Sequence, residues 1–166
     1  MLSVVPSVLV LGLAALAALL LLRRRWSPPD KVGERNGAAR ALAVALAVQG
    51  LHFAEEMATG FHEALPAAFG LPAIPRSIFV IFNLTWLGIW VASVPGLRSA
   101  RPAAFFAAWF LAIAGMVNAV AHPLLAIAAE GYFPGLVSSP VIGAASVWLW
   151  LRLRGATRPA EALAGQ

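Results

Sequence analysis

Five apolar stretches, each close to the length that crosses a lipid bilayer, limit the folds open to this sequence more than any other feature. A transmembrane helix needs about 20 mainly apolar residues. The stretches run over residues 4–22, 41–58, 77–94, 103–129 and 136–151, and breaks rich in proline, glycine or charged residues separate them. This pattern predicts an all-α fold, a polytopic membrane helical bundle with five transmembrane helices.

The composition supports a membrane protein and removes some kinds of site. Only 11% of the residues are charged, against about 25% in soluble globular domains. The chain has no cysteine, which excludes disulfides and thiolate metal sites. The first stretch could be a signal peptide, but its charges follow it and no small-residue cleavage site comes after it. We therefore expect an uncleaved first span, with cleavage as the alternative.

The basic residues follow the positive-inside pattern of membrane proteins. If five spans alternate in direction, eleven of the 12 Lys and Arg residues fall on one side and only Arg76 falls on the other. We therefore predict an integral protein of the cytoplasmic (inner) membrane, with its N-terminus outside and its C-terminus in the cytoplasm. The net charge of +5 lies in short runs between apolar stretches, which argues against nucleic acid as a partner.

The second stretch carries His52, Glu55 and Glu56, three ionisable residues within one membrane helix. Each charged group near the centre of a bilayer costs at least about 2.5 kcal/mol on insertion scales. Residues three and four positions apart share one face of a helix, so His52 lies beside both glutamates. We interpret this cluster as functional, because holding helices together does not require so many ionisable groups.

Two other stretches carry polar residues at a similar depth. With a rise of about 1.5 Å per residue, His52 and Glu56 lie about 18 and 24 Å from the cytoplasmic end of their span. Asn118 and His122 lie about 24 and 30 Å from the same side, and Asn83 lies about 10 Å from the outer end of its span. All five fall in the outer half of a hydrocarbon core about 30 Å thick. The sequence therefore predicts one polar site built from three helices.

Imidazole and carboxylate groups are ligands for zinc and for non-haem iron. His52, Glu56 and His122 would form a three-ligand site with an open position, as in catalytic zinc centres, and Glu55 is an alternative carboxylate ligand. The spare glutamate could act as a general base or orient a ligand. The candidate catalytic residues are Glu55, Glu56 and His52, and the candidate substrate-binding residues are Asn83, Asn118 and Tyr132. The expected activity is hydrolase-like or acid–base chemistry on a lipid-soluble small molecule or a membrane-associated substrate.

Other interpretations of the same residues stay open. Without a metal, His52 and one protonated glutamate could form an acid–base pair. The cluster could also serve a small proton- or cation-coupled transporter, or only join helices by hydrogen bonds in a structural membrane subunit. The inner halves of the spans hold little polarity apart from Gln49 and Ser93, which disfavours a polar path across the membrane. Membrane lipid is the expected surrounding partner, and a homodimer is an option that transport would need more than catalysis.

The sequence LHFAEE at residues 51–56 resembles the signature of the HXXEE-motif family, small integral membrane proteins of unknown function. Asn83, Asn118, His122 and the Tyr-x-Pro-Gly element at residues 132–135 are similar to later polar elements of that family. The resemblance covers residues 52–137. It implies a multi-span membrane protein suspected of being an enzyme, and it supplies no metal, substrate or catalytic assignment.

With this resemblance, the chain divides into four predicted parts. Residues 1–22 form an N-terminal transmembrane helix that is added to the family core, and residues 23–40 form a basic cytoplasmic loop. Residues 41–154 form the HXXEE-type four-helix membrane domain, and residues 155–166 form a mobile cytoplasmic tail.

Overall fold

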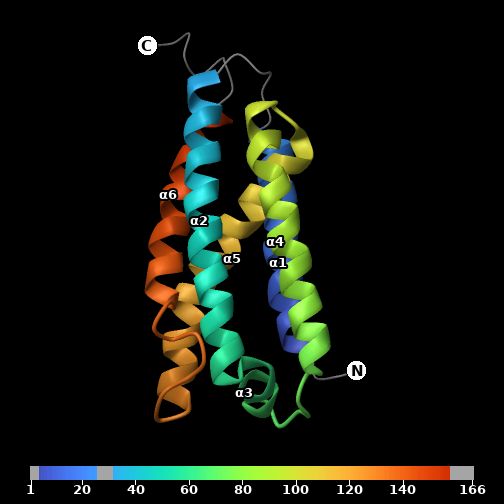
Figure 1. Cartoon of the computed structure of the whole chain (residues 1–166), viewed down its shortest axis with the longest axis vertical. Coiled ribbons are helices and arrows are strands. Elements are labelled where there is room, and N and C mark those ends of the chain that lie inside the picture. Colours follow the sequence, from blue (N-terminus) through green and yellow to red (C-terminus); the bar gives the residue numbers. More distant parts are fainter. Residues whose placement is uncertain (1–3, 26–31, 158–166) are drawn as a thin grey trace.

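A computed structural model of the chain describes residues 4–25 and 32–157, and it confirms the all-α fold (Figure 1). The described helices are α1 (Val5–Arg25), α2 (Val32–Thr59), α3 (Phe61–Ala67), α4 (Arg76–Arg98), α5 (Pro102–Ala128) and α6 (Ser139–Ala156). Residues 158–166, most of the predicted tail, lie outside the described residues.

Four of the described helices, α1, α2, α4 and α5, are long and apolar enough to cross a membrane. By these properties the chain is a membrane protein. The fifth predicted span is not confirmed, because α6, which carries Arg152 and Arg154 in its last turns, is not among the helices apolar enough to cross a membrane. It also begins at Ser139 rather than at residue 136, since residues 129–138 form a non-helical segment, which we call the strap.

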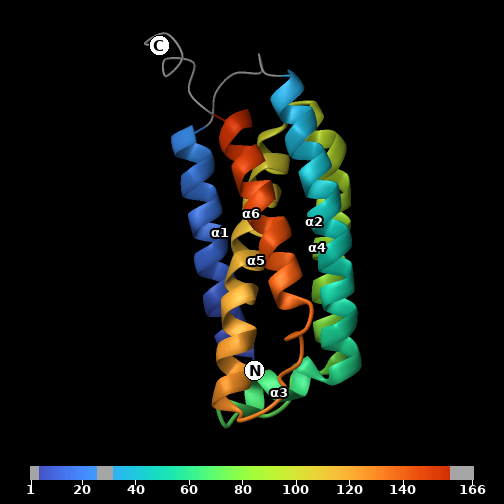
Figure 2. The same ribbon diagram turned by 90° about the vertical axis from the view of Figure 1, so that its left-hand side faces the viewer.

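Helix α5 lies at the centre of the bundle. It packs against α1, α4 and α6, while α2 packs against α4 and α6. Helices α2, α4, α5 and α6 thus form a ring in which each contacts two neighbours, and α1 lies outside the ring against α5 (Figures 1 and 2). The short helix α3 lies across one end of the bundle, next to the strap (Figure 2).

Helix boundaries follow local sequence signals more closely than hydropathy. Helix α2 begins at Val32, so residues 32–40 of the predicted basic loop are helical. It ends at Thr59, and Gly60 follows with a φ of 81°, which glycine adopts far more readily than other residues; α3 begins directly afterwards. Pro102 is at the first position of α5, where a missing N–H costs nothing.

The bundle core consists of apolar side chains from all five long helices, α1, α2, α4, α5 and α6, and includes Leu42, Leu97, Trp109 and Leu149. Small residues bring α5 and α6 together. A Cβ atom added at Gly115 would lie 3.0 Å from Ser146 Cβ, and one added at Gly143 would overlap the Cβ of Ala119. Close approach of helix backbones through small residues is the usual packing mode of membrane helices.

This close approach gives a stability prediction for Gly143. Because Ala119 Cβ cannot rotate away, Gly143→Ala should push α6 from α5 and lower the free energy of unfolding by about 1–3 kcal/mol. Gly88→Ala is the matched control, because nothing lies within 4 Å of a Cβ added there, and helix propensity alone should stabilise it by up to about 1 kcal/mol. Thermal denaturation of both variants in one detergent checks this. Equal stability of the two variants would contradict the packing described.

The arginines are segregated along the bundle. Helices α1, α4 and α6 end, and α2 and α5 begin, at the upper end in Figure 1. Every arginine in the described ranges except Arg76 lies toward that end, and Arg76 is at the start of α4, at the opposite end. The fold therefore has one basic end, as the distribution along the sequence predicts.

Candidate metal centre

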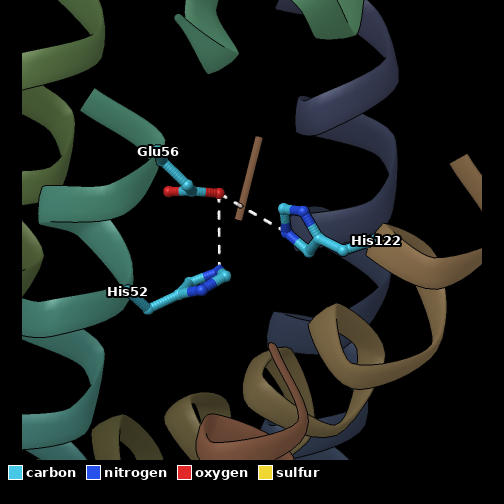
Figure 3. A group of neighbouring side chains, drawn as sticks. All are labelled: His52, Glu56 and His122. Carbon is cyan, nitrogen blue, oxygen red and sulfur yellow. Dashed lines mark ion pairs between the residues drawn. The ribbon is translucent and has the colours of Figure 1, made fainter. Parts of the chain in front are cut away.

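The predicted polar cluster lies near the end of the bundle opposite the arginines. His52 and Glu56 come from the last turns of α2, and His122 comes from α5 (Figure 3). The i, i+4 spacing places His52 and Glu56 one above the other on α2. The packing of α2, α5 and the strap then brings His122 toward the same point.

The imidazoles of His52 and His122 converge on one carboxylate oxygen of Glu56. His52 Nε2 and His122 Nε2 each lie 3.5 Å from Glu56 Oε1, as the dashed lines in Figure 3 show. The imidazole rings are edge to face, with centroids 4.8 Å apart and planes at 88°. All three residues are buried, with exposed fractions of 0% for His52, 5% for Glu56 and 2% for His122. Three potential ligand atoms thus face one another away from solvent.

The other nitrogen of each imidazole is bonded to the strap. His122 Nδ1 lies 2.6 Å from the carbonyl oxygen of Pro134. A carbonyl only accepts hydrogen bonds, so Nδ1 carries the hydrogen and the Nε2 lone pair of neutral His122 faces Glu56. His52 Nδ1 lies 2.7 Å from Ser138 Oγ. On its other side, His52 Nε2 lies 3.2 Å from the amide nitrogen of Asn118.

Glu55 points away from the converging atoms and binds the strap. Its Oε1 accepts hydrogen bonds from the Tyr132 hydroxyl at 2.7 Å and from the Val137 N–H at 3.0 Å. Its Oε2 accepts from the Ser138 N–H at 2.8 Å and from the Ser138 hydroxyl. The carboxylate therefore lies just before the first turn of α6, where the helix dipole favours a negative charge.

Tyr132 lies in the strap and is about half exposed. Partial desolvation and then the hydrogen bond to Glu55 raise the pKa of its phenol. Tyr132 thus stays protonated at neutral pH and donates to Glu55. This contact places the predicted substrate-binding Tyr132 beside Glu55 rather than beside the histidines.

Gly135 brings the strap backbone directly against both imidazoles. Its φ is +86°, and a Cβ added there would lie 2.6 Å from His122 Nδ1 and 3.0 Å from His52 Cε1. Aromatic rings cover the remaining side of His122: the centroids of Phe61 and Phe133 lie 5.4 and 6.1 Å from it. The strap and α3 therefore enclose the cluster.

The structure brings most of the predicted site residues together. His52, Glu56 and His122 converge, Asn118 contacts His52, and Glu55 contacts Tyr132. Asn83 is separate: its amide donates to the carbonyl oxygen of Phe79 in its own helix, at 3.0 Å. Among the described hydrogen bonds, none joins Asn83 to the cluster. The substrate-binding role predicted for Asn83 therefore stays a prediction with no contact to support it.

Sequence reasoning did not identify Ser138 or the backbone roles of Pro134 and Gly135. Ser138 is the N-cap residue of α6, and a serine there ordinarily caps the helix with its hydroxyl. Its hydroxyl makes no such cap bond and contacts His52 and Glu55 instead. No sequence signal separates this serine from an ordinary N-cap, whereas the Pro-Gly pair marks a turn without indicating what the turn contacts.

His52, Glu56 and His122 could hold a metal ion, since one ligand atom from each lies within 4.8 Å of the others. Two imidazoles with one carboxylate form a ligand set found in both zinc and non-haem iron sites.

The chain was compared with protein-family models, curated proteins and solved structures, and it matches none of them. The resemblance to the HXXEE-motif family therefore rests on the motif residues of the sequence alone.

Proposed function

We propose that the protein is a membrane-embedded, metal-dependent enzyme with hydrolase-like chemistry on a lipid-soluble substrate. The observation that carries this proposal is the convergence of His52 Nε2 and His122 Nε2 on one oxygen of Glu56, at 3.5 Å each. The hydrogen bond from His122 Nδ1 to Pro134 supports the proposal further, because histidine ligands usually donate their second nitrogen to such a partner.

The 3.5 Å separations support a metal site in preference to a hydrogen-bond network. They are longer than ordinary N–H···O hydrogen bonds, which span about 2.7–3.2 Å. Ligands at about 2.0–2.1 Å from a tetrahedral zinc ion lie roughly 3.3–3.4 Å apart, close to both His–Glu56 separations. The three ligand atoms together lie within 4.8 Å of one another.

Zinc is the first candidate ion, with iron(II) as the second. Three protein ligands leave an open position, at which bound zinc supplies an activated water near neutral pH. In this proposal Glu56 is a ligand, and Asn118 lies beside His52 where it can orient a substrate carbonyl. Glu55 already accepts four hydrogen bonds from the strap, so we assign it a positioning role rather than that of a free general base.

Apolar residues surround the site, which supports a substrate that arrives from the membrane. The exposed neighbours of the cluster along α2, α5 and the strap include Leu51, Val120, Leu124 and Val137. A water-soluble substrate would have to cross these surfaces, whereas a lipid-soluble one would partition onto them.

The core on the other side of the site argues against a transporter. Between the cluster and the basic end, α2 and α5 bury Leu42, Ala45, Ala108, Trp109 and Ala112. Among the described residues, the buried polar side chains in this part of the bundle are Gln49, Ser93 and Ser146. This sparse polarity disfavours the continuous polar path that a coupled carrier would need.

The finer membrane assignments belong to the same proposal. With α6 as a short fifth span, the basic end lies in the cytoplasm and the metal centre lies in the outer half of the inner membrane. The chain would then be a member of the HXXEE-motif family with one extra helix, α1, which lies outside the four-helix ring.

Lipid turnover by purified protein tests the proposed activity. Wild-type, Glu56→Gln and Glu63→Gln proteins would be reconstituted with zinc in vesicles of mixed phosphatidylethanolamine, phosphatidylglycerol and diacylglycerol. Glu63 is the matched control, because its side chain is 71% exposed and lies outside the cluster. We expect a cleaved lipid product, detected by mass spectrometry, from the wild type and Glu63→Gln but not from Glu56→Gln. Identical lipid profiles for all three would count against hydrolysis of these lipid classes.

A further inference from the structure

The side chain of Ser138 links Glu55 to His52. Its hydroxyl donates to Glu55 Oε2, and the same oxygen lies 2.7 Å from His52 Nδ1. No other residue in the described ranges has a side chain bonded to both Glu55 and His52. Ser138 thus contacts one proposed metal ligand and one residue that is not a ligand.

The direction of these two bonds follows from the donors around Glu55. The Tyr132 hydroxyl and the N–H groups of Val137 and Ser138 all donate to this carboxylate, so it acts as an acceptor. The single hydrogen of the Ser138 hydroxyl therefore points to Glu55, and its oxygen is left to accept from His52 Nδ1. With the hydrogen on Nδ1, Nε2 of His52 carries the lone pair. This agrees with the Asn118 amide nitrogen, a donor, at 3.2 Å from Nε2, and the same Nε2 lies 3.5 Å from Glu56 Oε1.

The strap accepts a hydrogen bond from the Nδ1 atom of both imidazoles. The carbonyl oxygen of Pro134 accepts from His122 Nδ1, and Ser138 Oγ accepts from His52 Nδ1. Helix α6 does not use the Ser138 hydroxyl, since its N-cap has no side-chain hydrogen bond. Removing the hydroxyl should therefore alter the site without removing a helix cap.

We infer that Ser138 is a positioning residue for the metal centre: anchored by Glu55, it fixes the tautomer and ring orientation of His52. This inference rests on the proposed metal site. Partners that hold the second nitrogen of a metal-bound histidine typically change metal affinity by about 10–100-fold. Ser138 is the one of the two partners that substitution can remove, because the partner of His122 is a backbone carbonyl.

The test is the zinc affinity of the full chain in detergent, measured by competition with a chromophoric chelator after metal removal. Ser138→Ala should weaken zinc binding by about 10–100-fold, and Ser138→Thr, which keeps the hydroxyl, should stay within about threefold of the wild type. Tyr132→Phe is the matched control, because it removes another donor to Glu55 that does not reach His52. It should also stay within about threefold. The visible spectrum of the cobalt-loaded protein should change for Ser138→Ala and not for Tyr132→Phe.

The outcomes separate this inference from the proposed function. If the wild type binds one zinc that Glu56→Gln loses, while Ser138→Ala binds as tightly as the wild type, the role of Ser138 is wrong and the metal site stands. If Tyr132→Phe loses as much affinity as Ser138→Ala, the hydroxyl only holds the strap, which also overturns the inference. A wild-type protein that binds no zinc or cobalt overturns both.

Discussion

Replacing either histidine of the cluster by alanine should lower zinc affinity by more than about 100-fold, because the outer partners of such ligands alone account for 10–100-fold. His52→Ala and His122→Ala each remove one of the three converging ligand atoms. Two remaining ligands would hold an ion weakly and without fixed geometry. Isothermal titration of the purified variants, after removal of bound metal, measures the effect.

The chain provides its own control for this prediction. The sequence has three histidines, and His62 is the one outside the cluster. It lies in α3, stacked on Phe79 with ring centroids 6.0 Å apart. His62→Ala should therefore bind zinc as the wild type does. If His62→Ala weakened binding as strongly as His122→Ala, the ion would not be held by the cluster described here. Circular dichroism of each variant would confirm that the helices are retained.

The second large effect is expected at Gly135. An alanine at a φ of +86° costs about 1–2 kcal/mol in backbone energy, and overpacking against the two imidazoles adds about 1–3 kcal/mol. Gly135→Ala should therefore lower the free energy of unfolding by roughly 2–5 kcal/mol. It should also reduce zinc binding, because the new Cβ displaces the rings of His122 and His52.

Gly131→Ala is the matched control within the same strap. The nearest atom to a Cβ added at Gly131 is the carbonyl oxygen of Ala129, at an ordinary distance of 3.8 Å. Its stability should stay within about 0.5 kcal/mol of the wild type. Thermal unfolding and zinc titration of the two variants in parallel measure both effects. A Gly135→Ala protein as stable as Gly131→Ala would show that the strap does not press on the histidines.

The fold class and the convergence of three residues could be predicted because they follow from periodicity and depth. His52 and Glu56 share a helix face, and His122 lies at a similar depth on another span. Depth also placed Asn83 at the level of the site, but depth does not determine how its helix is rotated about the helix axis. The Asn83 amide donates to the carbonyl oxygen of Phe79 in its own helix, and the direction that such a polar residue faces in an apolar helix depends on packing.

The strap and the end of the last helix could not be predicted for a different reason. Hydropathy merges the apolar Leu136 and Val137 with the residues of α6, although the chain is not helical there. One partner of Glu55 is Ser138, a serine that no sequence signal separates from an ordinary helix cap. Long-range contacts of this kind depend on where a loop folds back, which the local pattern of residues does not encode.

The metal content of purified protein tests the central claim most directly. Wild-type, Glu56→Gln and Glu63→Gln proteins would be isolated without chelators, and zinc and iron would be measured together with protein concentration. We expect about one zinc or iron ion per chain in the wild type and in Glu63→Gln, and less than about one tenth of that in Glu56→Gln, since the charged ligand between the two imidazoles is lost. A wild-type protein with no bound ion even after reconstitution, or a Glu56→Gln protein with the same content as the wild type, would contradict this expectation.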